Sequence, residues 1–190
     1  LWELTQDTGS HPRWDARFSA ITPTGTTPDG AWRFRYELRL PFHTISGTGI
    51  SLGERRRPGG TRTSALRFTT RDRLSPLGDG RGYWRYTPTE EGIRFVTGYD
   101  YDPGWGILDV VVRPLLGWAT AWSFDRLRIW VEGGAEPEAW PLTSVLQPWR
   151  RDRPRASRTR RAPAGGSRRG DQLHDAPATL AALPDPGGDR

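Results

Sequence analysis

Residues 31–42 read AWRFRYELRLPF, and apolar and charged side chains alternate through this stretch. From Trp32 to Leu40 every second residue is aromatic or leucine, and arginine or glutamate stands between them. Successive side chains of a strand point to opposite faces, so the alternation predicts a strand with one buried and one solvated face. Such half-buried strands are typical of antiparallel sheets.

Five further segments have the composition of strands, and each is bounded by glycine, proline or other turn-forming residues. They are residues 16–24, 44–54, 61–70, 82–88 and 93–102. Because the connections between them are short, the sequence predicts a six-stranded antiparallel meander.

A helical period surrounds the strands. Two short helices are expected in residues 1–15, the second beginning near Pro12 with Ser10 as its cap. After the strands, a long helix is predicted over about 107–132, and Pro114 should kink it or mark its true start. Its apolar stripe is wide, so we expect the helix to lie along the sheet. The predicted solvent face carries Asp125, Arg128 and Glu132.

The 190-residue chain contains no cysteine, and its three histidines do not have the spacing of metal ligands. We therefore expect no disulfide, no metal site and no cofactor. No stretch of the sequence reaches the roughly 18 consecutive apolar residues of a membrane span. The expectation is a cytoplasmic protein with no integral membrane segment.

The net charge of +6 is concentrated at the C-terminal end, because residues 150–190 hold 10 of the 28 basic residues and 5 of the 22 acidic ones. This segment has few large apolar residues, so we predict that it is a disordered tail, separated from the domain by an extension at 133–149. The arginine-rich run 150–161 is an alternative contact site for nucleic acid or an anionic surface. It has no interleaved aromatic residues, so nucleic-acid binding is not our main expectation.

The order of elements resembles the helix-grip fold of the SRPBCC superfamily (START/Bet v 1-like), especially its bacterial polyketide cyclase/dehydrase-like members. The stretch 115–132 is similar to the closing helix of actinobacterial members. The resemblance covers about residues 1–132. Those members have a strand before the first helix, and we expect that this strand is missing here and leaves a sheet edge unpaired. Their opening pattern is formed here by Trp2, Leu4, Asp7, His11, Pro12, Trp14 and Asp15.

The resemblance implies an α+β domain in which a curved antiparallel sheet wraps the long C-terminal helix. It also implies an apolar cavity between them for a small hydrophobic molecule such as a lipid or a polyketide. Binding of this molecule is the expected function, although the same aromatic side chains could simply fill a core. The strand alternation points seven aromatic side chains toward the expected cavity, and the long helix adds Trp122; the eight are Phe34, Tyr36, Phe68, Trp84, Tyr86, Tyr99, Tyr101 and Trp122.

The alternative function is that of a polyketide cyclase or dehydratase, with cavity tyrosines or the pair His11 and Asp15 as acid/base groups. In the family that the chain resembles, this pair mostly packs and caps the second helix. Asp100 and Asp102 are a second pair of carboxylates, but the alternation turns them away from Tyr99 and Tyr101. The glycines of SGTGIS (46–51) lie in a predicted strand, so they favour sheet curvature or a bulge and not a phosphate loop.

Overall fold

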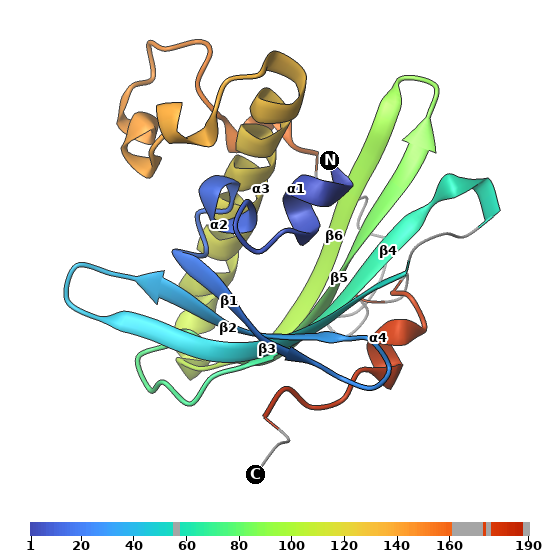
Figure 1. The fold of residues 1–190 in the computed structure, drawn as a ribbon. Coiled ribbons are helices and arrows are strands. Elements are labelled where there is room, and N and C mark those ends of the chain that lie inside the picture. The colour runs from blue at the N-terminus through green and yellow to red at the C-terminus, as the bar shows by residue number, and fades with distance from the viewer. Residues whose placement is uncertain (55–57, 161–172, 174–175, 188–190) are drawn as a thin grey trace. The chain divides into compact units, whose positions relative to one another are not determined.

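The structure is a computed structural model that describes residues 1–54, 58–160, 173 and 176–187. It is an α+β fold with a six-strand antiparallel sheet and one long helix, as predicted (Figure 1). The strands are β1 (Ala20–Thr26), β2 (Trp32–Arg39), β3 (Thr44–Glu54), β4 (Arg62–Thr69), β5 (Leu77–Thr89) and β6 (Gly92–Pro103). The α-helices are α1 (Trp2–Gln6), α2 (His11–Trp14), α3 (Asp109–Gly133) and α4 (Thr179–Ala182). The 3-10 turns are η1 (Pro58–Gly60), η2 (Gly106–Leu108), η3 (Pro137–Ala139), η4 (Leu142–Leu146) and η5 (Ala156–Arg158).

The sheet is the predicted meander, because strands that follow each other in the chain are also neighbours in the order β1-β2-β3-β4-β5-β6. Two strand starts differ from the prediction. β1 begins at Ala20 and not at residue 16, because a turn in which the Phe18 amide donates to the Asp15 carbonyl precedes it. β5 begins at Leu77, five residues before the predicted start at 82, and continues the pairing with β6 across an irregularity.

The chain forms two compact units. Unit 1 contains residues 1–21, 37–44 and 107–161, and therefore α1, α2 and α3. Unit 2 contains residues 22–36, 45–106 and 162–190, and therefore most of the sheet and α4.

In unit 1, α3 begins at Asp109, so Pro114 lies inside the helix and does not start it. The helix ends at Gly134, which adopts a left-handed conformation with φ of 69° and donates its amide to the Trp130 carbonyl. Glycine is favoured at such a helix end because it has no side chain to strain this conformation.

The predicted solvent face of α3 is wrong at Asp125, which is only 2% exposed. Residues 30 positions later cover it: the Arg155 amide donates to Asp125 Oδ2 over 2.8 Å, and Arg158 Nη1 lies 3.2 Å from the same oxygen. The Thr159 hydroxyl also donates to the Ala121 carbonyl, at 2.9 Å. The segment 155–159 was expected to be disordered, and here it is held against α3.

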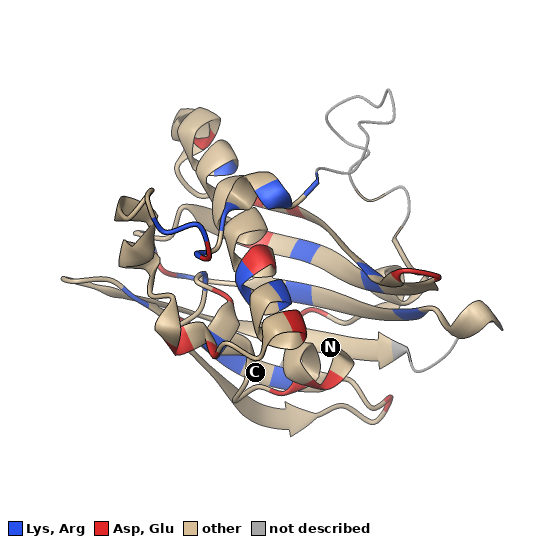
Figure 2. Ribbon diagram, turned by 90° about the horizontal axis from the view of Figure 1, so that it is seen from above, with Lys and Arg blue, Asp and Glu red and all other residues tan. Residues whose placement is uncertain are grey.

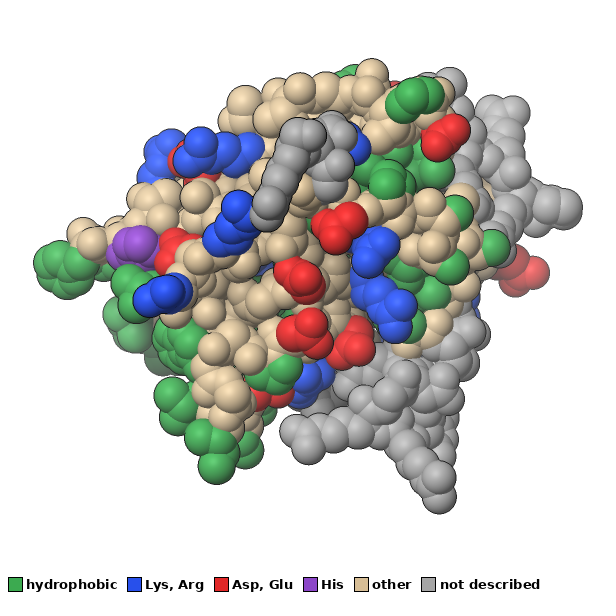
Figure 3. All heavy atoms as spheres, turned by 90° about the horizontal axis from the view of Figure 1, so that it is seen from below, with side chains coloured by type: hydrophobic (Ala, Val, Ile, Leu, Met, Phe, Trp, Pro, Cys, Tyr) green, Lys and Arg blue, Asp and Glu red, His purple; other side chains and the backbone are tan. Residues whose placement is uncertain are grey.

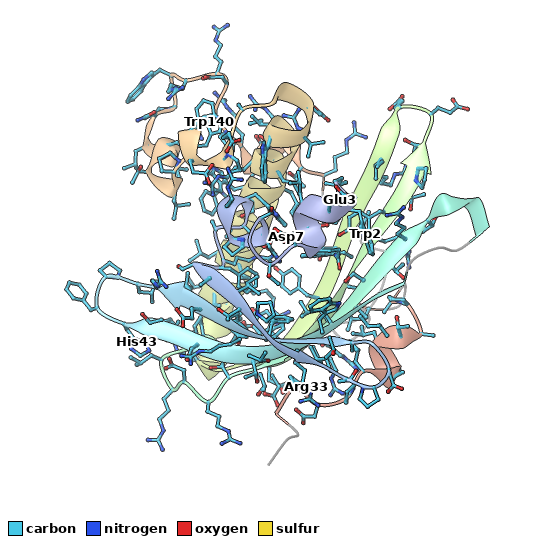
Figure 4. All side chains as sticks on the ribbon, viewed as in Figure 1. Trp2, Glu3, Asp7, Arg33, His43 and Trp140 are labelled. Carbon is cyan, nitrogen blue, oxygen red and sulfur yellow. The ribbon has the colours of Figure 1, made fainter. Side chains whose placement is uncertain are left out.

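Unit 2 also contains part of the predicted tail. Leu180 and Leu183, at and just after α4, are buried with Ile50 and Ala65 on one face of the sheet. Arg67 Nη1 donates to the Leu183 carbonyl over 2.8 Å. Figure 4 shows Arg33 pointing to the side of the sheet on which α4 lies. The prediction of disorder therefore does not hold for residues 176–187, whereas its other parts, 161–172, 174–175 and 188–190, lie outside the described residues.

Candidate functional site

One face of the sheet in unit 2 is aromatic. The antiparallel register places Phe68 opposite Gly49 and Gly80, and it places Trp84 opposite Thr97. Residues directly opposite each other point to the same face of a sheet. Seven of the eight predicted cavity residues therefore share this face, which we call the aromatic face: Phe34, Tyr36, Phe68, Trp84, Tyr86, Tyr99 and Tyr101.

Glycines of neighbouring strands lie directly beneath three of these rings. A Cβ atom built on Gly49 would come well under 3.0 Å from the ring of Phe34. The same holds for Gly80 and the ring of Phe68. A Cβ on Gly47 would meet both the Tyr36 ring and the Thr69 carbonyl. The absence of a side chain at these positions lets the rings lie down against the backbone of the next strand.

Several rings of the aromatic face also contact one another. Tyr36 and Phe68 meet edge to face with their centroids 6.3 Å apart. Tyr86 stacks on Phe95 at 4.8 Å, and Tyr99 stacks on Tyr101 at 6.4 Å. Such pairs add about 0.5–1.5 kcal/mol each to the stabilisation from burial, so the ring positions are held by mutual contact.

Burial differs along the aromatic face. Tyr36, Tyr86 and Tyr101 are buried, with exposed fractions of 9%, 4% and 5%. Phe34, Phe68, Trp84 and Tyr99 are half-buried and keep part of their surface open. These four side chains are the ones that an apolar molecule can contact on unit 2.

The phenol of Tyr36 has a raised pKa. Burial raises the pKa of Tyr36 to about 12, and the negative charge of Asp79 adds to the shift. The hydroxyl lies 3.4 Å from the Thr69 carbonyl, to which it donates. The phenol is thus a neutral hydrogen-bond donor throughout the physiological range.

We expect Tyr36 to make the protein sensitive to alkali. Because its pKa is raised in the folded state, its contribution to stability is complete below about pH 10 and is lost as the pH rises from about 10 to 12. Tyr36→Phe should remove this component, which urea unfolding at several pH values between 8 and 12 would measure. Parallel pH profiles for the two proteins would contradict the assignment.

Trp122, the eighth predicted cavity residue, belongs to α3 and thus to unit 1. It is 1% exposed, stacks on Trp118 at 6.4 Å, and its Nε1 has no hydrogen-bond partner in the described part of the chain. The Arg126 guanidinium lies 5.4 Å from the centre of its ring. The cavity predicted between sheet and helix would combine residues of both units, and it stays a prediction.

His11 and Asp15 form part of an ion-pair cluster in unit 1. His11 Nε2 lies 3.1 Å from Asp15 Oδ2, and Arg17 donates to both carboxylate oxygens at 2.9 and 2.7 Å. Burial alone would raise the pKa of Asp15, but the Arg17 charge and the hydrogen bonds from His11 and Arg17 outweigh it and hold that pKa well below its usual range. A fully buried, permanently charged carboxylate of this kind is a poor proton donor.

The same cluster orders the opening helices. Trp14 stacks on His11 with the rings 4.8 Å apart, and its Nε1 donates to the Leu4 carbonyl over 3.1 Å. Ser10 precedes α2 as expected, although its side chain makes no capping bond; its amide donates to Asp7 Oδ2 instead. These contacts give the opening pattern of the chain a packing role.

Asp100 and Asp102 do not belong to the aromatic face. Asp100 lies opposite Arg81 in the register, on the other side of the sheet from Tyr99 and Tyr101, and Asp102 is exposed. Two of the glycines under the rings, Gly47 and Gly49, were predicted only to favour sheet curvature or a bulge. A sequence pattern could have indicated this packing: β3 contains Gly-x-Gly at 47–49, and the neighbouring strand β2 contains aromatic-x-aromatic at 34–36.

No protein-family model matches the chain. Over 153 residues it is 40% identical to a protein of Bacillus subtilis (strain 168) named uncharacterized membrane protein YndG; the match covers 77% of this chain and 57% of that protein. The chain thus spans little more than half the length of this relative. Among solved structures, TTHA0849 from Thermus thermophilus is similar with a TM-score of 0.43 and 15% identity, over 63% of this chain and 75% of that one.

The Bacillus relative corrects several expectations. Its source contradicts the actinobacterial assignment, and its name contradicts the expected cytoplasmic localisation and the expected absence of an integral membrane segment. One described helix, Gly106–Gly133, is long and apolar enough to cross a membrane by length and composition, a test that core helices of soluble proteins also pass. The sequence did not predict this helix as a membrane span because Asp109 and Arg113 interrupt its apolar residues.

Proposed function

We propose that the aromatic face of the sheet binds an apolar molecule of the lipid or polyketide type in a membrane-associated protein. The observation that carries this proposal is the seating of Phe34, Tyr36 and Phe68 on glycines of the neighbouring strands. Each of these rings approaches the backbone of the neighbouring strand, where the glycine leaves room for it. Rings held in this way line one face of the sheet with apolar surface.

The chemistry of the face fits a mostly apolar partner. Between the rings the register places Ser64, Leu66, Thr97 and glycines, none of which is charged, and one charged residue, Arg62, lies opposite Tyr86 at the end of the face. The tyrosine hydroxyls supply a few polar points, as in pockets for small apolar molecules. A molecule with an aliphatic or polycyclic body and one or two polar groups matches this pattern.

Membrane association is the second part of the proposal. It is supported by the name of the Bacillus relative and by the apolar helix Gly106–Gly133, of which only 22% of the most apolar window is buried. A helix that serves as the core of a soluble protein would be mostly buried. An apolar ligand is also most abundant at a membrane.

The SRPBCC-type helix-grip arrangement remains part of this proposal. It is supported by the order of elements, with two short helices, a six-strand meander and one long helix. The enzyme alternative has no specific support in the geometry, because Asp15 is fully engaged with His11 and Arg17.

Fluorescent fatty acid binding tests the ligand site. We expect the full chain to give a saturable rise in cis-parinaric acid fluorescence at micromolar concentration. Trp84→Ala should weaken the binding about tenfold, because a half-buried indole of the face loses its contact with the probe. Arg85→Ala is the matched control: it changes the next residue of β5, which points to the opposite face, and should bind as the wild type does.

Two results would contradict the proposal. One is a folded wild-type protein with no saturable probe binding. The other is an equal loss in Trp84→Ala and Arg85→Ala, which would show that the aromatic face is not the site of binding. Circular dichroism of both variants would establish that they are folded.

A further inference from the structure

The first half of α3, with the turn before it, exposes an unusual amount of apolar surface. Five large apolar side chains within nine residues are more than half exposed: Ile107 (90%), Leu108 (54%), Val110 (73%), Val111 (64%) and Leu115 (61%). Single exposed apolar residues are ordinary, but a contiguous group of this size marks a surface that meets another apolar phase.

The charged residues of this half are turned the other way. Asp109 is only 5% exposed, and Arg113 Nε donates to its carboxylate over 2.8 Å, one turn along the helix. In an ordinary surface helix the apolar side is covered and the charges face water. Here Asp109 and Arg113 form an ion pair on the side opposite the exposed apolar residues. This half of the helix therefore presents an uncharged apolar side to its surroundings.

Residues of this region form one line along the helix. Ile107, Val111, Pro114 and Trp118 follow each other three or four residues apart, so they share a face, which we call the bare stripe. Ala121 and Asp125 continue the same line. There, however, Arg155 and Thr159 cover the helix through their bonds to Asp125 and Ala121. The cover therefore begins where the bare stripe ends.

The covering segment is strongly basic. Residues 149–160 contain six arginines and one aspartate, and Arg150, Arg151 and Arg160 are exposed. Trp149, which precedes them, is 73% exposed. Figure 2 shows an uncharged stretch in the middle of α3, with the charged residues of its second half beyond it. Figure 3, the space-filling view from below, shows hydrophobic side chains (green) at the surface of the molecule.

We propose that unit 1 docks on an anionic phospholipid membrane, with the bare stripe in the acyl region of one leaflet and the exposed side chains of Arg150, Arg151 and Arg160 on lipid phosphates. This inference rests on the proposed membrane association and not on ligand binding. Arginine beside an exposed tryptophan suits the interface between acyl chains and headgroups. The excess of arginine next to the bare stripe favours an anionic lipid surface over the apolar patch of a protein partner.

The geometry favours docking over spanning. At 1.5 Å per residue the bare stripe is about 18 Å long, whereas the hydrocarbon core of a bilayer measures about 30 Å. Beyond the stripe α3 carries Arg126, Arg128 and Glu132, and Arg128 binds Asp125 and Glu132 at 2.8 Å. Drawing these groups through a bilayer would remove them from water, so only the first half of α3 enters the lipid.

Vesicle co-sedimentation of the full chain tests the docking surface. We expect the wild type to bind vesicles that contain phosphatidylglycerol more tightly than vesicles of pure phosphatidylcholine. The double variant Ile107→Gln, Val111→Gln should lose at least about tenfold in partitioning, because it removes apolar area without adding charge. Val131→Gln, on the same helix but outside the bare stripe and 45% exposed, is the matched control and should bind as the wild type does.

The arginines are tested separately. Arg151→Gln and Arg160→Gln should each weaken binding to anionic vesicles about fivefold at low salt and leave binding to neutral vesicles unchanged. Alkaline carbonate washing should release the docked protein.

The outcomes separate the two proposals. If the folded wild type binds no vesicles, membrane association and docking both fall. If the wild type binds but the double variant binds equally well, only the docking surface is wrong. Resistance of the wild type to carbonate would overturn docking in favour of a spanning helix. If the wild type self-associates but binds no vesicles, and the double variant does not self-associate, the bare stripe is instead a contact surface between two copies of the chain.

Discussion

Asp15→Ala is expected to lower the free energy of unfolding by about 3–5 kcal/mol at pH 7, the range for breaking a buried ion pair by removing one partner. The carboxylate is fully buried and accepts from the backbone amide, Nε and Nη2 of Arg17, while His11 Nε2 lies 3.1 Å away. The side chain of Arg17 is only 18% exposed. Without Asp15 its guanidinium would keep its charge and lose the hydrogen bonds that this carboxylate accepts.

The acid dependence gives this prediction a second readout. Because the pKa of Asp15 is lowered in the folded state, its contribution is complete above the unfolded-state pKa of about 4 and is lost as the pH falls below it. The difference between wild type and Asp15→Ala should therefore shrink below about pH 4, which urea unfolding at several pH values would measure. Asp29→Ala, in an exposed turn, is the control and should change stability by less than about 0.5 kcal/mol. A difference that is small at pH 7, or the same at pH 3, would contradict the assignment.

The role of Asp15 could be predicted in part. The spacing of His11 and Asp15 places them one helical turn apart, which favours a local packing role over catalysis. The strength of the pair depends on Arg17, which lies beyond the end of α2, and on the complete burial of Asp15. A helical period predicts neither the direction of the chain after residue 15 nor how deeply Asp15 is buried.

Asp125 shows where a helical wheel fails. The wheel assigns a charged residue beside Arg128 and Glu132 to solvent, which is right for an isolated helix. The covering segment comes from residues 155–159, about 30 positions later, and its composition is that of an unstructured chain. What holds it is a small number of specific hydrogen bonds to Asp125 and Ala121, and no periodic pattern announces such bonds.

The sheet was predicted well because alternation depends on each strand alone. The period of two in residues 31–42 fixes which side chains share a face, and the short connections make neighbours in the chain neighbours in the sheet. The register is different, since it is a relation between two strands. Alternation therefore found Phe68 on the aromatic face but could not place Gly80 beneath its ring.

The second large effect is expected at this ring. Gly80→Ala should lower the free energy of unfolding by about 2–3 kcal/mol, because the added methyl group would overlap the Phe68 ring and force it away from β5. Gly117→Ala is the matched control: nothing lies within 4 Å of its added Cβ, and it sits inside α3. There alanine should stabilise the protein by about 0.5–1 kcal/mol, since glycine is the poorer helix former.

A double-mutant cycle shows whether the ring is the cause. The nearest atoms to a Cβ on Gly80 all belong to Phe68, so Gly80→Ala should be almost neutral when Phe68→Ala has already removed the ring. Urea unfolding of the two single variants and the double variant measures this coupling. If Gly80→Ala destabilises both backgrounds equally, the strain lies in the backbone of β5. In that case the seating of the rings on glycines, on which the proposed binding of an apolar molecule depends, would lose its physical basis.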